Sequence, residues 1–161
     1  MAKAGYSAQT GGAVALVAAT AKTVLFVLAP AQFGLDLKKY RLSFDGVTAS
    51  NVPVFVEINY LTGATNSTPG TGNTSLATAP NLQQVYGRSI TAGFTGGYGC
   101  TSEPTVQTNI DAYLLTPNGG TVIYDFPLGD TPDTAVSNGV CIRLTAPAVV
   151  NARASLFFER C

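Results

Sequence analysis

Two carboxylates, Glu57 and Glu103, have the chemistry that a glycoside hydrolase would need. Such an enzyme holds two acids about 5–9.5 Å apart in a cleft, one as the proton donor and the other as base or nucleophile. Alternation along residues 54–60 places Glu57 on the outward face of a strand with Asn59, and the following Pro104 places Glu103 in a loop. Exposed acids on strands are common, so the pattern favours solvated or interface charges over a catalytic pair.

A second group of carboxylates, Asp125, Asp130 and Asp133, falls within nine residues. Oxygen ligands in a loop suit Ca²⁺, but this spacing does not match that of a calcium-binding loop. Pro127 and Pro132 make the segment a stiff turn, in which Asp occupies favoured positions. The sequence therefore predicts turn residues here and no metal.

Three cysteines, Cys100, Cys141 and Cys161, are widely spaced and form no CxxC pair, so zinc is not expected. A Cys100–Cys141 bridge remains open, as does a bridge between two chains through Cys161. Secretion, which favours disulfides, is not indicated. The favoured interpretation is three reduced thiols without a chemical role.

The absence of His removes Ser-His-Asp hydrolysis, Cys-His chemistry and imidazole metal sites. The glycine-rich residues 93–100 lack the Lys and the following helix of a phosphate-binding loop. Nine basic and nine acidic residues give a net charge of zero, which is unsuited to a nucleic-acid partner. The sequence thus predicts no enzyme, no cofactor and no nucleic acid.

The apolar residues 11–31 do not predict a membrane span, because Lys22 near their middle would cost about 2.5–3.5 kcal/mol there. A signal peptide fits them better, with Lys3 before an apolar run and a cleavage-like site at residues 19–21. We nevertheless expect the segment to stay in the folded domain, and no membrane partner.

Charged residues make up 11% of the chain, against about 25% in soluble domains generally. A dissolved monomer with so few charges and no net charge lacks the repulsion that keeps copies apart. We therefore expect other subunits to cover much of the surface. The alternative is that Thr, Ser, Asn and Gln keep an uncovered surface soluble.

Period-two alternation of apolar and polar residues indicates strands with one buried face. It is clearest in four segments, residues 40–45, 54–60, 140–145 and 152–158. Residues 23–29 are continuously apolar, which is typical of a strand covered on both faces. Proline spacing leaves room for short helical turns only at residues 30–39 and 82–86. The prediction is an all-β, single-domain, jelly-roll-like β-sandwich of eight or nine antiparallel strands.

The domain boundaries follow from composition. Residues 1–12 are small and polar and predict an N-terminal arm, and residues 13–161 form the β-sandwich domain with a long polar loop at 62–80. Asn118-Gly119-Gly120 predicts a hairpin that joins residues 111–115 to 121–126.

Four residues are candidates for an oligomer or capsid interface: Lys3 and Tyr6 in the arm, and Phe55 and Phe157 on strands. Each of these two Phe residues lies opposite its strand's core stripe and would be exposed in a monomer. Exposed apolar side chains often mark association sites. The alternative is that another strand layer of the same domain covers them.

Six short segments resemble small structural proteins encoded beside the capsid genes of tailed bacteriophages. They are residues 21–25 (AKTVL), 33–40 (FGLDLKKY), 43–50 (SFDGVTAS), 92–95 (AGFT), 124–130 (YDFPLGD) and 143–147 (RLTAP). The resemblance implies a virion component, a decoration or cement protein that sits as a trimer on an icosahedral shell, and it carries over no catalytic residue.

We therefore expect a non-enzymatic virion protein, assembled in the host cytoplasm, that forms a homo-oligomer, a trimer, and clamps the major capsid protein. Deleting residues 2–12 is then expected to weaken shell attachment while the trimer stays folded. The alternative is a carbohydrate-binding or receptor-binding β-sandwich module that uses Tyr98 with Glu57 or Asp111. The lack of Trp, the largest stacking surface for sugars, counts against this alternative.

Overall fold

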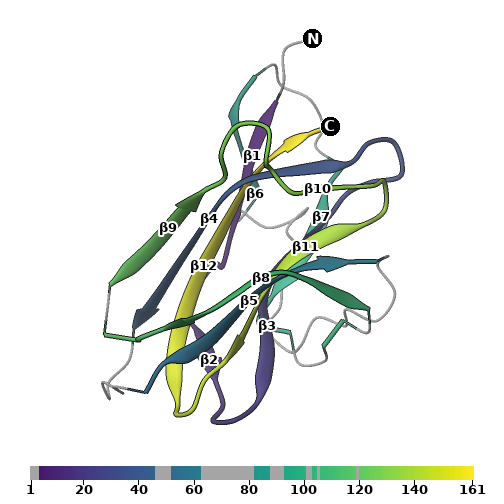
Figure 1. The fold of residues 1–161 in the computed structure, drawn as a ribbon. Coiled ribbons are helices and arrows are strands. Elements are labelled where there is room, and N and C mark those ends of the chain that lie inside the picture. The colour runs from purple at the N-terminus through teal and green to yellow at the C-terminus, as the bar shows by residue number, and fades with distance from the viewer. Residues whose placement is uncertain are drawn as a thin grey trace.

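The computed structural model describes residues 4–45, 52–62, 82–87, 93–100, 103–104, 106–118 and 120–161. These residues form two antiparallel β-sheets that pack face to face (Figure 1). No helix in this part of the chain is long and apolar enough to cross a membrane. The prediction of an all-β sandwich is confirmed, and its jelly-roll version stays a prediction.

The larger sheet has seven strands in the order β10-β4-β12-β1-β6, with β2 paired to β12 and β9 paired to β4. Its members are β1 (Gly5–Gln9), β2 (Val14–Leu16), β4 (Leu35–Asp45), β6 (Leu82–Tyr86), β9 (Thr121–Asp125), β10 (Asp133–Thr134) and β12 (Val150–Arg160). The two eleven-residue strands β4 and β12 pair with each other and form the centre of this sheet.

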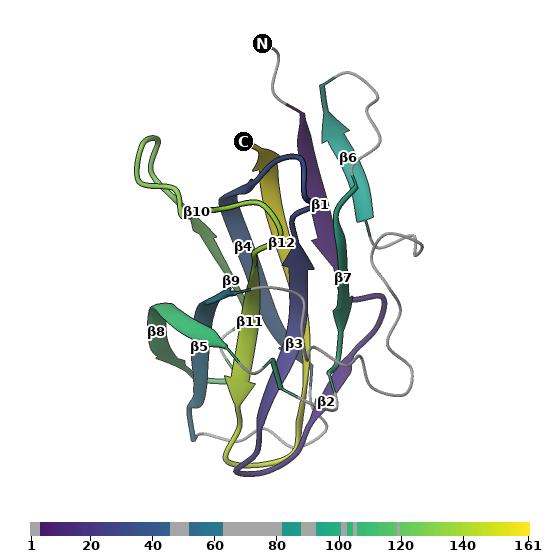
Figure 2. The same ribbon diagram turned by 90° about the vertical axis from the view of Figure 1, so that its right-hand side faces the viewer.

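The smaller sheet has five strands in the order β7-β3-β11-β5-β8. Its members are β3 (Ala21–Leu28), β5 (Val54–Leu61), β7 (Thr95–Tyr98), β8 (Gln107–Leu115) and β11 (Gly139–Thr145). Figure 2 shows β6 and β7 on one side of the sandwich and β8 and β9 on the other. The described residues thus hold twelve strands rather than eight or nine, because β2, β7 and β10 have only two to four residues, too few to show alternation.

The predicted inward stripes form the observed core. Tyr40, Leu42, Val56, Ile142 and Leu156 are each at most 1% exposed and belong to one cluster between the sheets. Residues 23–28 of β3 are buried on both faces, as predicted, because a smaller cluster covers the outer face of the strand. That outer cluster consists of Phe26, Leu28, Leu61, Cys100 and Cys141.

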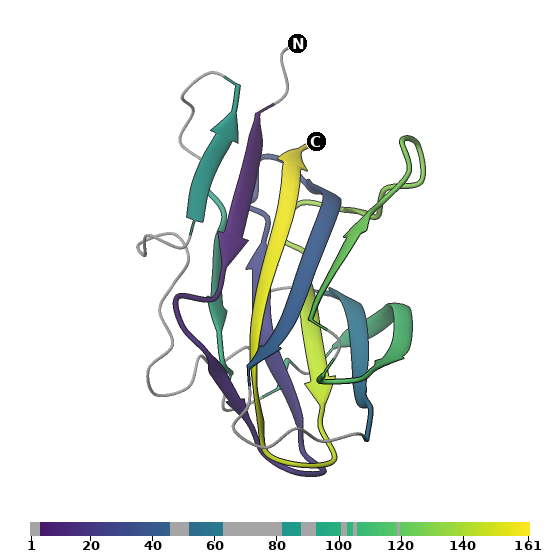
Figure 3. The same cartoon turned by 90° about the vertical axis from the view of Figure 1, so that its left-hand side faces the viewer.

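Residues 5–9 do not form an arm outside the sandwich. Gly5–Gln9 is strand β1, which pairs with β12 on one side and β6 on the other (Figure 3). Tyr6 is 2% exposed and its ring contacts Phe94 and Phe158. The reason is visible in the sequence, since Tyr6 and Ala8 alternate with Ser7 and Gln9 as in any half-buried strand.

The hairpin predicted around Asn118 is wrong. Strand β8 pairs with β5 in the smaller sheet, and β9 pairs with β4 in the larger one, so the connection crosses between sheets (Figure 1). Aromatic rings close the gap between the two edges: Tyr113 of β8 and Tyr124 of β9 both stack on Tyr40, at 6.5 and 5.4 Å between centroids. Tyr40 and Tyr124 are cross-strand neighbours within the larger sheet, so of these two stacks it is that of Tyr113 on Tyr40 that joins the two layers.

Candidate functional site

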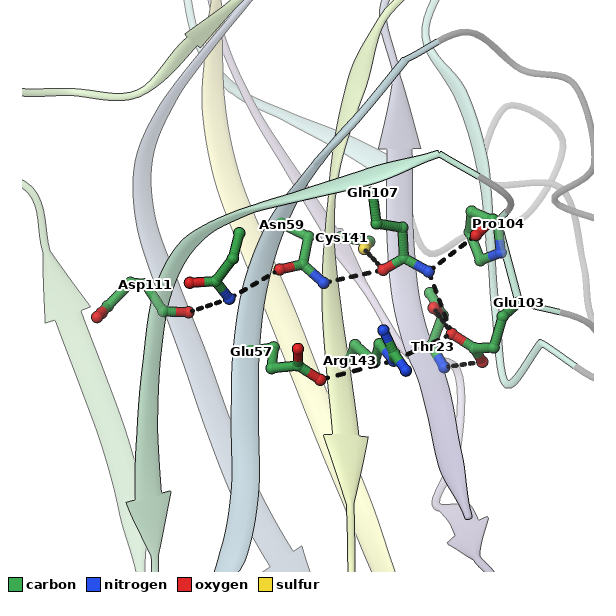
Figure 4. A network of polar contacts seen from close by, with 10 residues as sticks. Thr23, Glu57, Asn59, Glu103, Pro104, Gln107, Asp111, Cys141 and Arg143 are labelled. Atoms are coloured by element: carbon green, nitrogen blue, oxygen red, sulfur yellow. Dashed lines mark hydrogen bonds and ion pairs between the residues drawn. The ribbon is translucent and has the colours of Figure 1, made fainter.

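The most extensive set of polar contacts lies on the outer face of the smaller sheet, around Glu103 (Figure 4). Glu103 follows β7, and its Oε1 accepts a hydrogen bond from the Thr23 backbone N–H at 2.6 Å. Its Oε2 accepts from the Thr23 hydroxyl at 2.7 Å and from Gln107 Nε2 at 3.3 Å. A carboxylate that accepts three hydrogen bonds in this way ties its segment to β3.

A row of amide side chains continues this network across the sheet (Figure 4). Asn59 Nδ2 donates to Gln107 Oε1 at 2.9 Å, and Asn109 Nδ2 donates to Asn59 Oδ1 at 3.0 Å. The Cys141 thiol lies 3.5 Å from the same Gln107 oxygen. Asn59 is 2% exposed, so these bonds satisfy polar groups that have no access to water.

The structure brings Glu57 and Glu103 to the same cation. Arg143 Nε lies 3.6 Å from Glu57 Oε2 and 3.6 Å from Glu103 Oε2, which are ion-pair contacts and too long for good hydrogen bonds. The two carboxylates therefore both compensate the positive charge of Arg143. Sequence analysis placed Glu57 on the outer face correctly, but nothing in the sequence placed Glu103 beside it.

The cysteines of the described chain are all free thiols. Cys100 and Cys141 lie in the outer apolar cluster, and the Cys141 thiol contacts Gln107, which also bonds to Glu103. Burial, together with the nearby Glu103 carboxylate, raises the pKa of the Cys100 thiol to about 12. The same causes raise the pKa of the Cys141 thiol, whereas Cys161 is exposed at the end of the chain.

These differences predict that one thiol per native chain reacts with Ellman's reagent at pH 8, and three react in guanidinium chloride. Cys161 is accessible, while Cys100 and Cys141 are both buried and protonated at that pH. A Cys161→Ser variant should show no fast native reaction. Fast labelling of two or three thiols in the native wild type would contradict the buried positions of Cys100 and Cys141.

The three aspartates of residues 125–133 fall in separate local structures. Asp125 ends β9 and forms an ion pair with Lys39 at 2.8 Å, the Asp130 N–H donates to the Pro127 carbonyl at 3.1 Å in a turn, and Asp133 begins β10. Within the described residues, no group of three His, Cys, Asp or Glu side chains is placed to hold a metal ion.

The four predicted interface residues lie in different environments or, for Lys3, outside the described residues. Phe55 is 39% exposed on the outer face of β5, and Phe157 is half-buried beneath Lys39 and Arg41, which lie 5.8 and 5.7 Å from its ring centroid. Tyr6 is inside the core and cannot contact a partner without unfolding, so this assignment is corrected. Lys3 lies outside the described residues.

The sugar site suggested by Tyr98 is not assembled. Tyr98 is on β7 and packs against the core, whereas Glu57 is on β5 and Asp111 is on β8 at the opposite edge of the same sheet. Asp111 instead lies near the Tyr40 and Tyr113 hydroxyls, where its charge helps to raise the pKa of both. The remaining part of the predicted polar loop, residues 63–80, lies outside the described residues.

Two features escaped the sequence analysis. Leu114 is 65% exposed beside Phe55. Alternation along β8 indicates that its side chain points outward, but the predicted hairpin made β9 the neighbour of β8 and so did not place Leu114 next to Phe55. A pocket lined by Tyr60, Asp133 and Thr134 joins strands from both sheets, and no sequence signal brings these residues together.

No protein-family model, curated protein sequence or solved structure matches this chain. The fold is a β-sandwich, and the hydrogen bonds around Glu103 join segments of its smaller sheet to one another. The exposed surface and the pocket are the places where a partner or ligand could bind.

Proposed function

We propose that the protein is a non-enzymatic structural component of a virus particle, where it decorates and stabilises the capsid shell as a homo-oligomer, a trimer. The observation that carries the proposal is the Phe55 patch, which consists of the exposed side chains of Phe55, Ala112 and Leu114 on the smaller sheet. Phe55 and Leu114 are direct cross-strand partners, so their side chains form one apolar surface. Apolar surface of this kind favours association.

A second surface completes the geometry that a ring of copies needs. A cyclic trimer uses heterologous contacts, in which two different patches of each copy meet. The Phe157 patch on the larger sheet consists of Lys39, Arg41, Ile123 and Phe157, with Ile123 opposite Arg41 and Phe157 opposite Lys39. Each patch therefore presents exposed apolar side chains on a different sheet, Phe55 and Leu114 on the smaller sheet and Ile123 on the larger one.

A charge placed in either patch is expected to convert the oligomer to monomers. Sedimentation velocity should give three times the 16.6 kDa chain mass for the wild type and one chain mass for Leu114→Lys and for Ile123→Lys. Burying an unpaired ammonium in the contact costs several kcal/mol, which is tens to thousands-fold in association. Val85→Lys is the matched control, because Val85 is 55% exposed on β6, away from both patches. A wild-type chain that sediments as a monomer at high concentration excludes this self-association.

The virion role has its own test. Particles are purified by density gradient from cells that produce the virus encoding this chain, and their proteins are identified by mass spectrometry. The chain is expected in the particles at a fixed ratio to the major capsid protein. Its presence in the lysate and absence from intact particles would rule the virion role out.

A further inference from the structure

A pocket of about 370 Å³ opens at the end of the sandwich where β5 ends and β8 begins. Its lining includes Tyr60 and Leu61 of β5, Thr108 of β8, Asp133 and Thr134 of β10, and Asn138. Strands β5 and β8 belong to the smaller sheet and β10 to the larger one, so the pocket lies between the two layers. Small-molecule sites in proteins have volumes of about 300–1,000 Å³ and occupy such junctions.

The side chains of two residues in this lining, Asp133 and Thr134, lack an ion pair or a hydrogen bond within the described part of the chain. The Thr134 hydroxyl is buried in a residue that is 8% exposed and has no hydrogen-bond partner among the described residues. Asp133 forms no ion pair with any described residue. Burial and the Asp133 charge raise the pKa of the Tyr60 hydroxyl, which is therefore a neutral group at physiological pH. Asp133 and Thr108 are exposed, so their side-chain oxygens are groups that a ligand in the pocket can reach, whereas the Thr134 hydroxyl is shielded from solvent.

The walls of the pocket are held in place without a ligand. Strand β10 pairs with β4 through Asp133–Asp36 and Thr134–Leu35. The Ala29 N–H donates to the Asn138 carbonyl at 2.8 Å, and the Ser137 N–H donates to the Pro30 carbonyl at 3.1 Å. A site that is already rigid binds without the entropy loss of ordering its own residues.

We propose that this pocket binds one ring of a neutral sugar. The Asp133 carboxylate and the exposed Thr62 and Thr108 hydroxyls offer acceptors and donors for the hydroxyls of a sugar, and the Tyr60 ring and Leu61 offer an apolar face for its C–H groups. Asp133 disfavours anions, and none of the lining residues is Lys or Arg. A metal ion would need more than the one carboxylate of this lining. The proposal does not depend on the virion role, because a sugar site could serve any surface protein.

The first experiment titrates ¹⁵N-labelled protein with methyl glycosides of glucose, galactose, mannose and N-acetylglucosamine, followed by NMR. At least one of them is expected to give saturable shifts centred on Thr108, Asp133, Thr134 and Asn138. Absence of saturable shifts with all four, or shifts centred elsewhere, overturns the proposal. Methylammonium chloride is the competing probe, and stronger saturable shifts with it than with any sugar would show a cation site instead.

Two variants connect the binding to accessible polar groups of the lining. Thr108→Val keeps the shape and removes an exposed hydroxyl, so the folded chain should keep its stability while the sugar affinity falls about tenfold or more. Asp133→Asn should weaken binding to a similar extent. Thr121→Val on β9 is the matched control and should change neither property. Unchanged affinity in Thr108→Val contradicts the site. Binding by Leu114→Lys monomers separates this proposal from the oligomer, since either can fail alone.

Discussion

Deletion of residues 2–9 is expected to abolish cooperative folding. Strand β1 lies between β12 and β6, so its loss breaks the backbone hydrogen bonds on both sides and leaves β6 without a neighbour. The deletion also removes Ala4, Tyr6 and Ala8, each at most 2% exposed, from the main core. Circular dichroism and urea titration should show no sharp unfolding transition. This is the opposite of what a detachable arm would give.

Point variants test the contribution of β1 to stability without removing the strand. Tyr6→Ala should cost about 3–5 kcal/mol, the range for large aromatic truncations in a core. Tyr6→Phe should be neutral or stabilising, because the Tyr6 hydroxyl is buried and has no partner among the described residues. Ser7→Ala, on the outward face of the same strand, should change stability by less than about 0.5 kcal/mol. A folded, fully cooperative 2–9 deletion would show that β1 is dispensable.

Substitution of Glu103 by Ala is expected to cost about 2–4 kcal/mol, although this side chain is far from the main core. The change removes two hydrogen bonds to Thr23, which is fully buried, and leaves the Thr23 N–H without its acceptor. It also removes a hydrogen bond that holds Gln107 beside the Cys141 thiol, and it truncates a side chain that lines the same pocket as Cys100. Urea titration measures the first effect, and native labelling of these two thiols with Ellman's reagent should rise in parallel.

Glu57→Ala is the matched control for Glu103→Ala. Glu57 lies at the same 3.6 Å from Arg143, but no hydrogen bond joins it to backbone in the described structure. A partly exposed ion pair is worth about 0–1 kcal/mol, so the loss of stability should stay within that range and the thiols should stay protected. Equal effects of the two substitutions would mean that the charge of Arg143, rather than the bonds to Thr23, holds the segment around Glu103.

Alternation predicted the long strands because the direction of each side chain depends only on its position along its own strand. Alternation in residues 40–45 and 140–145 predicts an inward direction for Tyr40 and Leu42 of β4 and for Val140 and Ile142 of β11, and all four lie in the core. The same rule works for β1, where Tyr6 and Ala8 point inward, but small polar neighbours and the terminal position suggested an arm. Residues 82–86, compatible with a helical turn, became β6 because β1 offered an edge to pair with.

Strand partners and the polar network could not be predicted, since they depend on which segments meet. The residues around Asn118 are a good local signal for a hairpin. In the structure, however, β8 pairs with the edge of β5 and β9 pairs with the edge of β4. Glu103 and Thr23 are eighty residues apart in sequence. Register shifts near Ile58 and Ile142 further change which side chains are opposite one another, and period-two patterns do not reveal such shifts.

Strand β3 has apolar neighbours above and below it and paired strands on both sides. Water can reach its amide hydrogens only after the outer cluster lifts and the sheet separates, so their exchange with solvent requires the largest opening the molecule undergoes. Strand β6, exposed along four of its five residues, needs only a local opening. The protein therefore has a gradient of local stability across its width, and it yields first at the β6 edge and last along β3.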